Sequence, residues 1–301
     1  MRVPFSPYSP RAFAGTVRRR FFPPPRRDDV LDDSISIGDS RPDFWLGFVG
    51  DLCPLWGRTP VIDDSIVQFF SGCDRLIGNL EGVFSDRSWR PLIMLHDEGL
   101  FHVLEAIAPL DHWLLSVANN HAADGGTESL VRTRERLAGC GIQTLGTTET
   151  PRLAITDDIS LSAWTWWTNL PSHTLQMKDP GPGSDKLLSI AFPHWGYEGI
   201  RSPHASQHPP GGYALTVGHH SHLPQRLQAL ENDRFVAWSL GNFITGKRLR
   251  ILKEGAVLKV GLAAQPGQPP RIVRLDLRET AISSPSPGMV SVRFRNLEKT
   301  V

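Results

Sequence analysis

Apolar runs that end in polar or charged residues recur along the chain after residue 43. Such runs predict buried strands, whereas apolar residues spaced three and four positions apart predict helices. The strand pattern covers residues 44–51, 75–82, 113–121, 152–156, 160–167, 187–196, 213–220 and 234–243. The helical pattern covers residues 64–70, 98–108 and 127–141. This alternation indicates an α/β protein.

The two ends of the chain depart from that pattern. From residue 255 onward, apolar and polar positions alternate with period two, which predicts a β-rich C-terminal part. Residues 1–42 are rich in proline and arginine without sustained periodicity, so we interpret them as an extension before a single domain over residues 43–301. An arginine cluster in the extension could contact phosphates, but a partly ordered extension that packs its aromatic residues on the domain is favoured. The cluster comprises Arg18, Arg19, Arg20, Arg26 and Arg27.

Composition narrows the function classes. The chain has 301 residues, 40% of them hydrophobic and 21% charged, with a net charge of +1, so bulk charge indicates no nucleic-acid or membrane partner. Its three cysteines, Cys53, Cys73 and Cys140, are scattered, which favours reduced thiols over a disulfide framework. No apolar run approaches the roughly 20 residues of a membrane span, and no secretory signal is apparent. We therefore expect a cytoplasmic protein without a membrane anchor.

The polar residues at the ends of the predicted strands are of types that bind metals or move protons. Asp51, Glu81, the pair Asn120–His121, His194 and the group 219–222 each follow an apolar run. In α/β sheets the loops after the strands converge on one ligand site. Carboxylate, amide and imidazole ligands together suit Mn²⁺, Zn²⁺ or Fe. The sequence thus predicts a site for one or two such divalent ions.

Three histidines crowd the stretch TVGHHSHLPQ at residues 216–225. If this stretch were a strand, His220 and His222 would face the same side and could reach one metal cluster. On a tight turn, His219 and His222 could do so instead. The sequence leaves both arrangements open, but metal ligation explains the close spacing better than a pH-sensitive patch.

Six motifs in order resemble the CapA family, named for poly-γ-glutamate capsule synthesis, a branch of the calcineurin-like metallophosphoesterase superfamily. They are VGDLCP, IGNLEG, SVANNHAADGG, FPHWGYE, VGHHSH and WSLGNF, and they span residues 44 to 245. The resemblance implies a metallophosphoesterase-like β-sandwich flanked by helices, with a one- or two-metal site at the C-terminal ends of strands.

The resemblance also assigns roles by position. It implies that His121 donates a proton and that Asp124 orients it, with Glu81 at the place of the superfamily's bridging carboxylate. The implied metal ligands are Asp51, Glu81, Asn120, His194, His220 and His222. His219 is a further candidate, because the sequence does not decide which two of His219, His220 and His222 ligate. Substrate or supporting contacts are expected from Asn79, Trp195, Glu198 and Asn242.

Some positions depart from the superfamily's pattern. Its first motif is Asp-x-His, but Cys53 stands at the third place, so one metal position is expected to have fewer ligands. Ser221 replaces a proline that is usual in the family. The segment 202–213 contains Pro-Pro-Gly-Gly, which breaks any helix there and leaves His204 and His208 as candidates for the mouth of the site.

These features predict a soluble metal-dependent hydrolase that uses a metal-bound water or hydroxide on a phosphoester or on a peptide or γ-glutamyl amide, with His121 as general acid. The alternative is an accessory subunit of poly-γ-glutamate or related peptide-polymer synthesis that uses the site for binding. Because we expect no membrane anchor, the capsule role is disfavoured. The substrate, small molecule or peptide, and the oligomeric state stay open. The sequence WTWW at 164–167 either walls the substrate pocket or packs in the core.

Overall fold

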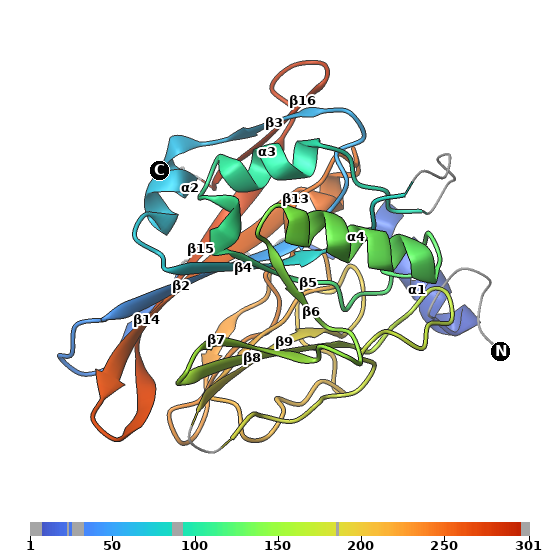
Figure 1. Ribbon diagram of the computed structural model, residues 1–301. Helices are drawn as coiled ribbons and strands as arrows, with labels where there is room; N and C mark the ends of the chain where they lie inside the picture. The colour runs from blue at the N-terminus through green and yellow to red at the C-terminus, as the bar shows by residue number, and fades with distance from the viewer. Residues whose placement is uncertain (1–7, 23, 26–32, 86–92, 185–186, 296–301) are drawn as a thin grey trace.

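The computed structural model contains two β-sheets packed face to face, with helices on the outer face of the larger sheet (Figure 1). This arrangement confirms the predicted mixed α/β class, a β-sandwich flanked by helices. The structure describes residues 8–22, 24–25, 33–85, 93–184 and 187–295.

The larger sheet has ten strands within these residues, in the order β3-β16-β15-β14-β2-β4-β5-β6, with β1 paired to β15 and β13 paired to β2. Its strands β2, β4, β5 and β6 run parallel, whereas β14, β15 and β16 form an antiparallel C-terminal meander. The meander confirms the predicted β-rich end. The strands are β1 (Asp33–Ser36), β2 (Phe44–Leu52), β3 (Thr59–Ile62), β4 (Arg75–Leu80), β5 (Trp113–Ser116), β6 (Gln143–Leu145), β13 (Asn242–Ile244), β14 (Glu254–Gln265), β15 (Gln268–Ser283) and β16 (Met289–Phe294).

The smaller sheet has six strands in the order β11-β12-β10-β9-β8-β7, and its central strands β8, β9, β10 and β12 are parallel. They are β7 (Arg152–Thr156), β8 (Ile159–Thr165), β9 (Leu188–His194), β10 (Leu215–Val217), β11 (Leu227–Ala229) and β12 (Phe235–Ala237). A buried core joins the two sheets, in which Phe48 of β2 lies against Phe192 of β9, with ring centroids 6.1 Å apart. The continuous apolar runs of both strands follow from burial on two faces.

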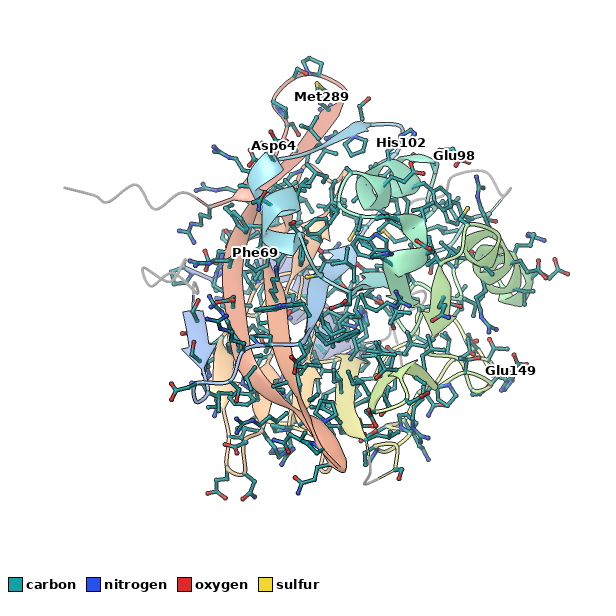
Figure 2. All side chains as sticks on the ribbon, turned by 60° about the vertical axis from the view of Figure 1, so that its left-hand side comes forward. Asp64, Phe69, Glu98, His102, Glu149 and Met289 are labelled. Carbon is teal, nitrogen blue, oxygen red and sulfur yellow. The ribbon has the colours of Figure 1, made fainter. Side chains whose placement is uncertain are left out.

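The second core lies on the other face of the larger sheet, beneath α2 (Asp64–Phe70), α3 (Gly99–Glu105) and α4 (Thr127–Gly139). Figure 2 shows α2 against this sheet, and the Phe69 ring meets Phe294 of β16 edge to face at 5.5 Å. The Asp63 side chain caps α2 by accepting the Ser65 backbone N–H. Two short 3₁₀ helices, η1 (Leu110–His112) and η2 (Arg250–Leu252), complete the described helices besides α1. In the described part of the chain, no helix is long and apolar enough to cross a membrane.

Strand register brings polar side chains to one level at the carboxyl end of β2. Asp51 is the register partner of Asn79 in β4 and of Asn242 in β13. On the smaller sheet, His194 at the end of β9 forms a bridge with His219, just past β10. The predicted site at the C-terminal ends of strands therefore lies where the edges of the two sheets meet.

The N-terminal extension contributes two elements. Residues 10–21 form helix α1 (Pro10–Phe21), which Ser9 caps by accepting the Ala12 backbone N–H. Strand β1, at residues 33–36, pairs with β15 of the larger sheet, so the sheet begins earlier in the chain than residue 43. The aromatic packing expected of the extension occurs at Tyr8, whereas Phe21 and Phe22 are exposed. Arg26 and Arg27 lie outside the described residues.

Candidate metal centre

Two groups of buried, potentially metal-binding side chains meet at the carboxyl end of β2. The first group contains Asp51, His194 and His219, and the second contains Cys53, Glu81 and His222. In each group, one ligand atom from every residue lies within 4.8 Å of the others. The first group draws on both sheets, because Asp51 belongs to β2 and His194 to β9.

One carboxylate faces both groups. Asp51 Oδ1 lies 3.3 Å from His219 Nδ1, and Asp51 Oδ2 lies 3.4 Å from His222 Nδ1. Glu81 Oε2 lies 3.6 Å from His222 Nδ1 and accepts a hydrogen bond from Cys53 Sγ at 3.1 Å. The resemblance implied a bridging carboxylate at Glu81, whereas in this structure Asp51 lies between the two groups.

The histidine-rich stretch forms a turn. Strand β10 ends at Val217, and His220 (φ 90°) and His222 (φ 58°) occupy the left-handed region, which non-glycine residues seldom adopt. This turn sends His219 toward the first group and His222 toward the second. The backbone N–H of His220 donates to Asp51 Oδ2 at 3.1 Å. Of the two arrangements that the sequence left open, the structure has the turn.

The charges in the centre stabilise one another. Burial alone would raise the pKa of Asp51, but hydrogen bonds from His219 and His222 outweigh burial and hold this pKa well below its usual range. Burial likewise opposes protonation of His222, yet Glu81 and Asp51 raise its pKa to about 9. The pKa of His194 falls well below its usual value, because burial and the nearby histidines disfavour its charged form.

Several polar atoms of the centre are buried without a hydrogen-bond partner. They are Glu81 Oε1, His219 Nε2 and His220 Nδ1. Burying a carboxylate oxygen with no partner is costly, and a cation removes that cost. The donor set of carboxylates, imidazoles and one thiol suits a divalent transition metal. The residues of both groups therefore fit a metal site.

His121 lies beside the first group, on the loop after β5. Its Nδ1 is 2.7 Å from Asp124 Oδ2 and 3.2 Å from Asn169 Nδ2. The preceding residue, Asn120, directs Oδ1 to His194 Nε2 at 2.8 Å. Asp124 thus holds one nitrogen of His121, as the sequence predicted for an orienting partner, while Asn120 contacts the first group.

The remaining predicted site residues are also placed. Asn79 donates to Asp51 Oδ1 at 2.8 Å, and Asn242 Oδ1 lies 2.9 Å from His222 Nδ1, so both support ligands of the centre. Glu198 is buried and accepts hydrogen bonds from the Tyr8 hydroxyl at 3.5 Å and from Arg20 at 2.9 Å. Trp195 instead packs in a small apolar cluster, stacked on Trp238.

The WTWW segment is divided between the core and the surroundings of the centre. Trp164 is buried against Tyr213, whereas Trp167 lies near the centre, with its ring centroid 6.4 Å from that of His220. The segment 202–213 contains no helix, as predicted. In that segment, His204 is exposed, and its ring centroid lies 4.7 Å from that of Tyr197.

Sequence reasoning missed several residues around the centre. Sequence analysis assigned no ligand role to Cys53, whereas the structure places its thiol in the second group. Its position two residues after Asp51, where the superfamily has a histidine ligand, was the available signal. Asn119 holds the loop by donating to Leu80 O at 2.7 Å. Asn169 and Tyr8 lie outside the six motifs, and the expected packing of the extension's aromatic residues did not specify that Tyr8 would reach the centre.

Residues 40–156 and 184–247 match the model of a family described as bacterial capsule synthesis protein PGA_cap. These ranges make up more than half of the chain. The chain belongs to the PGA_cap family. The resemblance to CapA proteins is thereby confirmed.

Comparison with solved structures finds a candidate 5′-nucleotidase from Staphylococcus aureus, crystallised with alpha-ketoglutarate, at 13% identity and a TM-score of 0.42, over 78% of this chain and 53% of that one. This chain thus spans about half the length of that protein. It also finds the calcineurin-like phosphoesterase YfkN from Bacillus subtilis, at 11% identity and a TM-score of 0.42, over 80% of this chain and 91% of that one. A comparison with curated protein sequences finds no match.

Proposed function

We propose that this PGA_cap protein is a metal-dependent hydrolase of phosphoester or amide bonds. The observation that carries the proposal is the pair of buried ligand groups joined by Asp51, together with the His121–Asp124 pair on the loop after β5. The unpartnered Glu81 Oε1 supports the proposal, because burying a carboxylate oxygen without a hydrogen bond is costly and a bound cation would remove that cost.

We assign one divalent ion to each group. Asp51, His194 and His219 offer oxygen and nitrogen ligands, which suit Mn²⁺, Zn²⁺ or Fe. Cys53 adds a soft sulfur to the second group, which favours Zn²⁺ or Fe over Mn²⁺ there. Bound divalent ions lower the pKa of water and polarise the bond that is attacked.

The chain itself supplies the proton for the leaving group. When protonated, His121 donates its Nδ1–H to Asp124, which fixes the ring and leaves the Nε2–H for the leaving group. Asn169 Nδ2 lies 3.2 Å from the same His121 Nδ1 and can donate to it only when Nδ1 carries no proton, so Asp124 alone holds the protonated ring at this nitrogen. Asn169 Oδ1 accepts from Asn120 Nδ2 at 3.3 Å, which ties Asn169 to the residue that contacts the first group.

Replacing His121 tests this assignment. We expect His121→Asn to keep the wild-type metal content, because His121 belongs to neither ligand group, and to lose activity by about 10²-fold, as for a missing general acid. The measurements are elemental analysis of purified protein and turnover in a screen of phosphoesters and of γ-glutamyl and peptide amides. The deficit should shrink for 4-nitrophenyl esters, whose leaving group needs little protonation.

His102→Asn is the matched control, since His102 is exposed on α3, and it should behave as wild type. Loss of metal in His121→Asn would make His121 a ligand, and unchanged activity would make it a bystander. Metal-loaded wild-type protein that hydrolyses nothing in the screen would favour the binding role of an accessory synthesis subunit.

A further inference from the structure

The N-terminal segment Tyr8–Phe21 covers the candidate metal centre. The ring of Tyr8, 1% exposed, is stacked on Tyr197 at 5.8 Å and meets Trp167 edge to face at 5.1 Å. The His220 ring lies 6.2 Å away. We call the space bounded by Trp167, Tyr197 and His220 the aromatic slot. In the full chain, Tyr8 fills it.

The hydroxyl end of Tyr8 points at the centre. Its oxygen lies 2.7 Å from His220 Nε2, and the backbone of His220 is bonded directly to Asp51. Burial raises the pKa of Tyr8 well above its usual value, so the hydroxyl stays neutral. The phenol oxygen of Tyr8 thus contacts His220, which stands between the candidate ligands His219 and His222 in the sequence.

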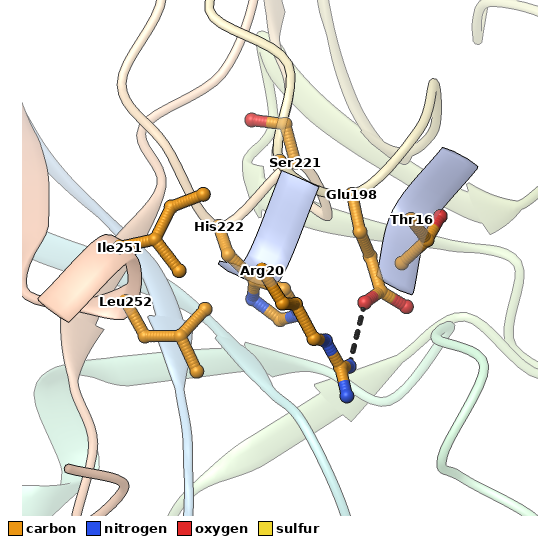
Figure 3. Close-up of a pocket in the computed structure, with 8 residues that line it drawn as sticks. Thr16, Arg20, Glu198, Ser221, His222, Ile251 and Leu252 are labelled. Atoms are coloured by element: carbon orange, nitrogen blue, oxygen red, sulfur yellow. Dashed lines mark hydrogen bonds and ion pairs between the residues drawn. The ribbon is translucent and has the colours of Figure 1, made fainter. Parts of the chain in front are cut away.

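Polar contacts from α1 converge on Glu198. Arg19 Nε donates to the Glu198 carbonyl at 2.8 Å, and Arg20 pairs with its carboxylate at 2.9 Å (Figure 3). A small cavity beneath α1 separates Thr16 and Arg20 from His222. At the end of the helix, Phe21 is 73% exposed. The segment is therefore held near the centre chiefly by Tyr8 in the slot and by the two arginines on Glu198.

We propose that the aromatic slot is the ligand subsite of the metal centre, that it takes a planar aromatic group carrying an oxygen, such as an aryl ester, and that Tyr8 occupies it as an intramolecular competitor. This inference deepens the proposed function and rests on it. The ring of Tyr8 shows how a flat ligand would fit: it stacks on Tyr197 and meets Trp167 edge to face. At the end of that ring, His220 contacts the oxygen. A tethered competitor acts at an effective concentration on the order of millimolar, so free ligands bind the full chain weakly.

The binding test uses 4-cresol, which is the Tyr8 side chain in free form, and toluene, which lacks the oxygen. By titration calorimetry, Tyr8→Ala should bind 4-cresol at least about tenfold more tightly than wild type, because the competitor is gone. It should prefer 4-cresol to toluene severalfold. Phe21→Ala, which removes an exposed ring from the same helix, should match wild type.

Because Tyr8→Ala leaves a ring-shaped space whatever its purpose, a second variant is needed. Arg20→Gln keeps Tyr8 and the domain core but removes the ion pair with Glu198, so it should loosen the segment. Binding of 4-cresol should rise in the same direction by a smaller factor. Arg20→Gln also keeps the test valid if Tyr8→Ala does not fold. Equal binding of 4-cresol and toluene in Tyr8→Ala, or no gain over wild type in Arg20→Gln, would overturn the proposal.

Turnover provides the separate test of substrate class. In Tyr8→Ala, the ratio of kcat/KM for phenyl phosphate to that for glycerol 2-phosphate should rise about tenfold over wild type, as the aryl group gains the slot. An unchanged ratio would reject the slot as a substrate subsite. If neither ester is hydrolysed by any variant, the hydrolase proposal fails for phosphoesters, while the calorimetric result still decides whether the slot binds an aromatic ligand.

Discussion

Asp51 organises the candidate centre at the residue scale. Its two carboxylate oxygens face different ligand groups, and it also accepts hydrogen bonds from Asn79 and from the backbone of His220. These donors hold the side chain before any ion arrives, because each oxygen is fixed by a separate element. Fixed ligands of this kind favour metal binding, since less conformational freedom is lost.

His222 tests the second group. We expect His222→Ala to lower the metal content per chain toward that of a one-ion site. The second group would keep only two of its three residues, Cys53 and Glu81, while the first group stays complete. Elemental analysis after purification without added metal measures this, with His102→Ala as the control. The same trace of metal in wild type and His222→Ala would mean that these residues hold no ion.

The cysteines should differ in reactivity. Burial raises the pKa of Cys73 to about 11, so at pH 8 its thiol is almost wholly protonated and a poor nucleophile, whereas Cys140 is exposed. Iodoacetamide should therefore modify Cys140 well before Cys73 in the folded protein, as followed by peptide mass spectrometry. In urea both should react. Equal rates in the native protein would contradict the burial of Cys73.

The motifs indicated the candidate ligands of the centre, but they did not indicate the residues that surround those ligands. Asp51 and His194 could be found because each ends a strong apolar run, and such runs stop at the edge of a sheet. Tyr8 could not, because it reaches the centre only through the packing of a segment about 190 residues away in sequence from Glu198. The choice between His219 and His220 also depended on backbone dihedral angles that no spacing encodes.

At the element scale, close approach between β2 and β13 shapes the centre. Asp51 N donates to Gly241 O at 2.8 Å, and a Cβ atom on Gly50 would lie 2.0 Å from that same oxygen. Only glycine at position 50 lets β13 lie this near β2. The contact places Asn242 beside Asp51, from where it reaches His222.

Gly50→Ala should therefore destabilise the fold by about 1 to 3 kcal/mol, the usual cost of overpacking, with a larger effect on metal content than on secondary structure. Gly139→Ala is the contrasting change, because Gly139 ends α4 with open space around it, and alanine there should stabilise by about 0.5 to 1 kcal/mol. Urea unfolding measures both. A Gly50→Ala protein as stable as wild type would contradict the crowding at this contact.

Long apolar strands and amphipathic helices were predictable, but their interruptions were not. The run 234–243 reads as one strand, yet the structure divides it into β12 in the smaller sheet and β13 in the larger one. Only tertiary structure shows that the chain crosses between sheets there. Helix α1 was not predicted, although Phe13, Val17 and Phe21 are spaced four residues apart in it. Those spaced positions do not hold the helix, since Phe13 and Phe21 are exposed, and its contacts with the domain are those of Tyr8, Arg19 and Arg20.

At the scale of the whole molecule, the centre joins the two sheets. Asp51 comes from the larger sheet, and His194 lies at the end of a strand of the smaller one. An ion held by both would connect the sheets at the edge where their strands end. Binding at such a junction stabilises the folded chain as a whole, because unfolding separates the ligands.

Removing the metal should therefore lower the melting temperature of the entire protein. An ion present at 100 times its Kd adds about 2.7 kcal/mol, which corresponds to roughly 4 °C in a chain of 301 residues. Differential scanning fluorimetry with and without EDTA measures the shift, and Asp51→Asn, which lacks the carboxylate shared by both groups, should melt at the same temperature in either condition. If EDTA strips the metal from the wild type, as elemental analysis can verify, and the melting temperature stays unchanged, the ion does not join the sheets. If Asp51→Asn responds to EDTA as strongly as wild type, the stabilising ion binds elsewhere.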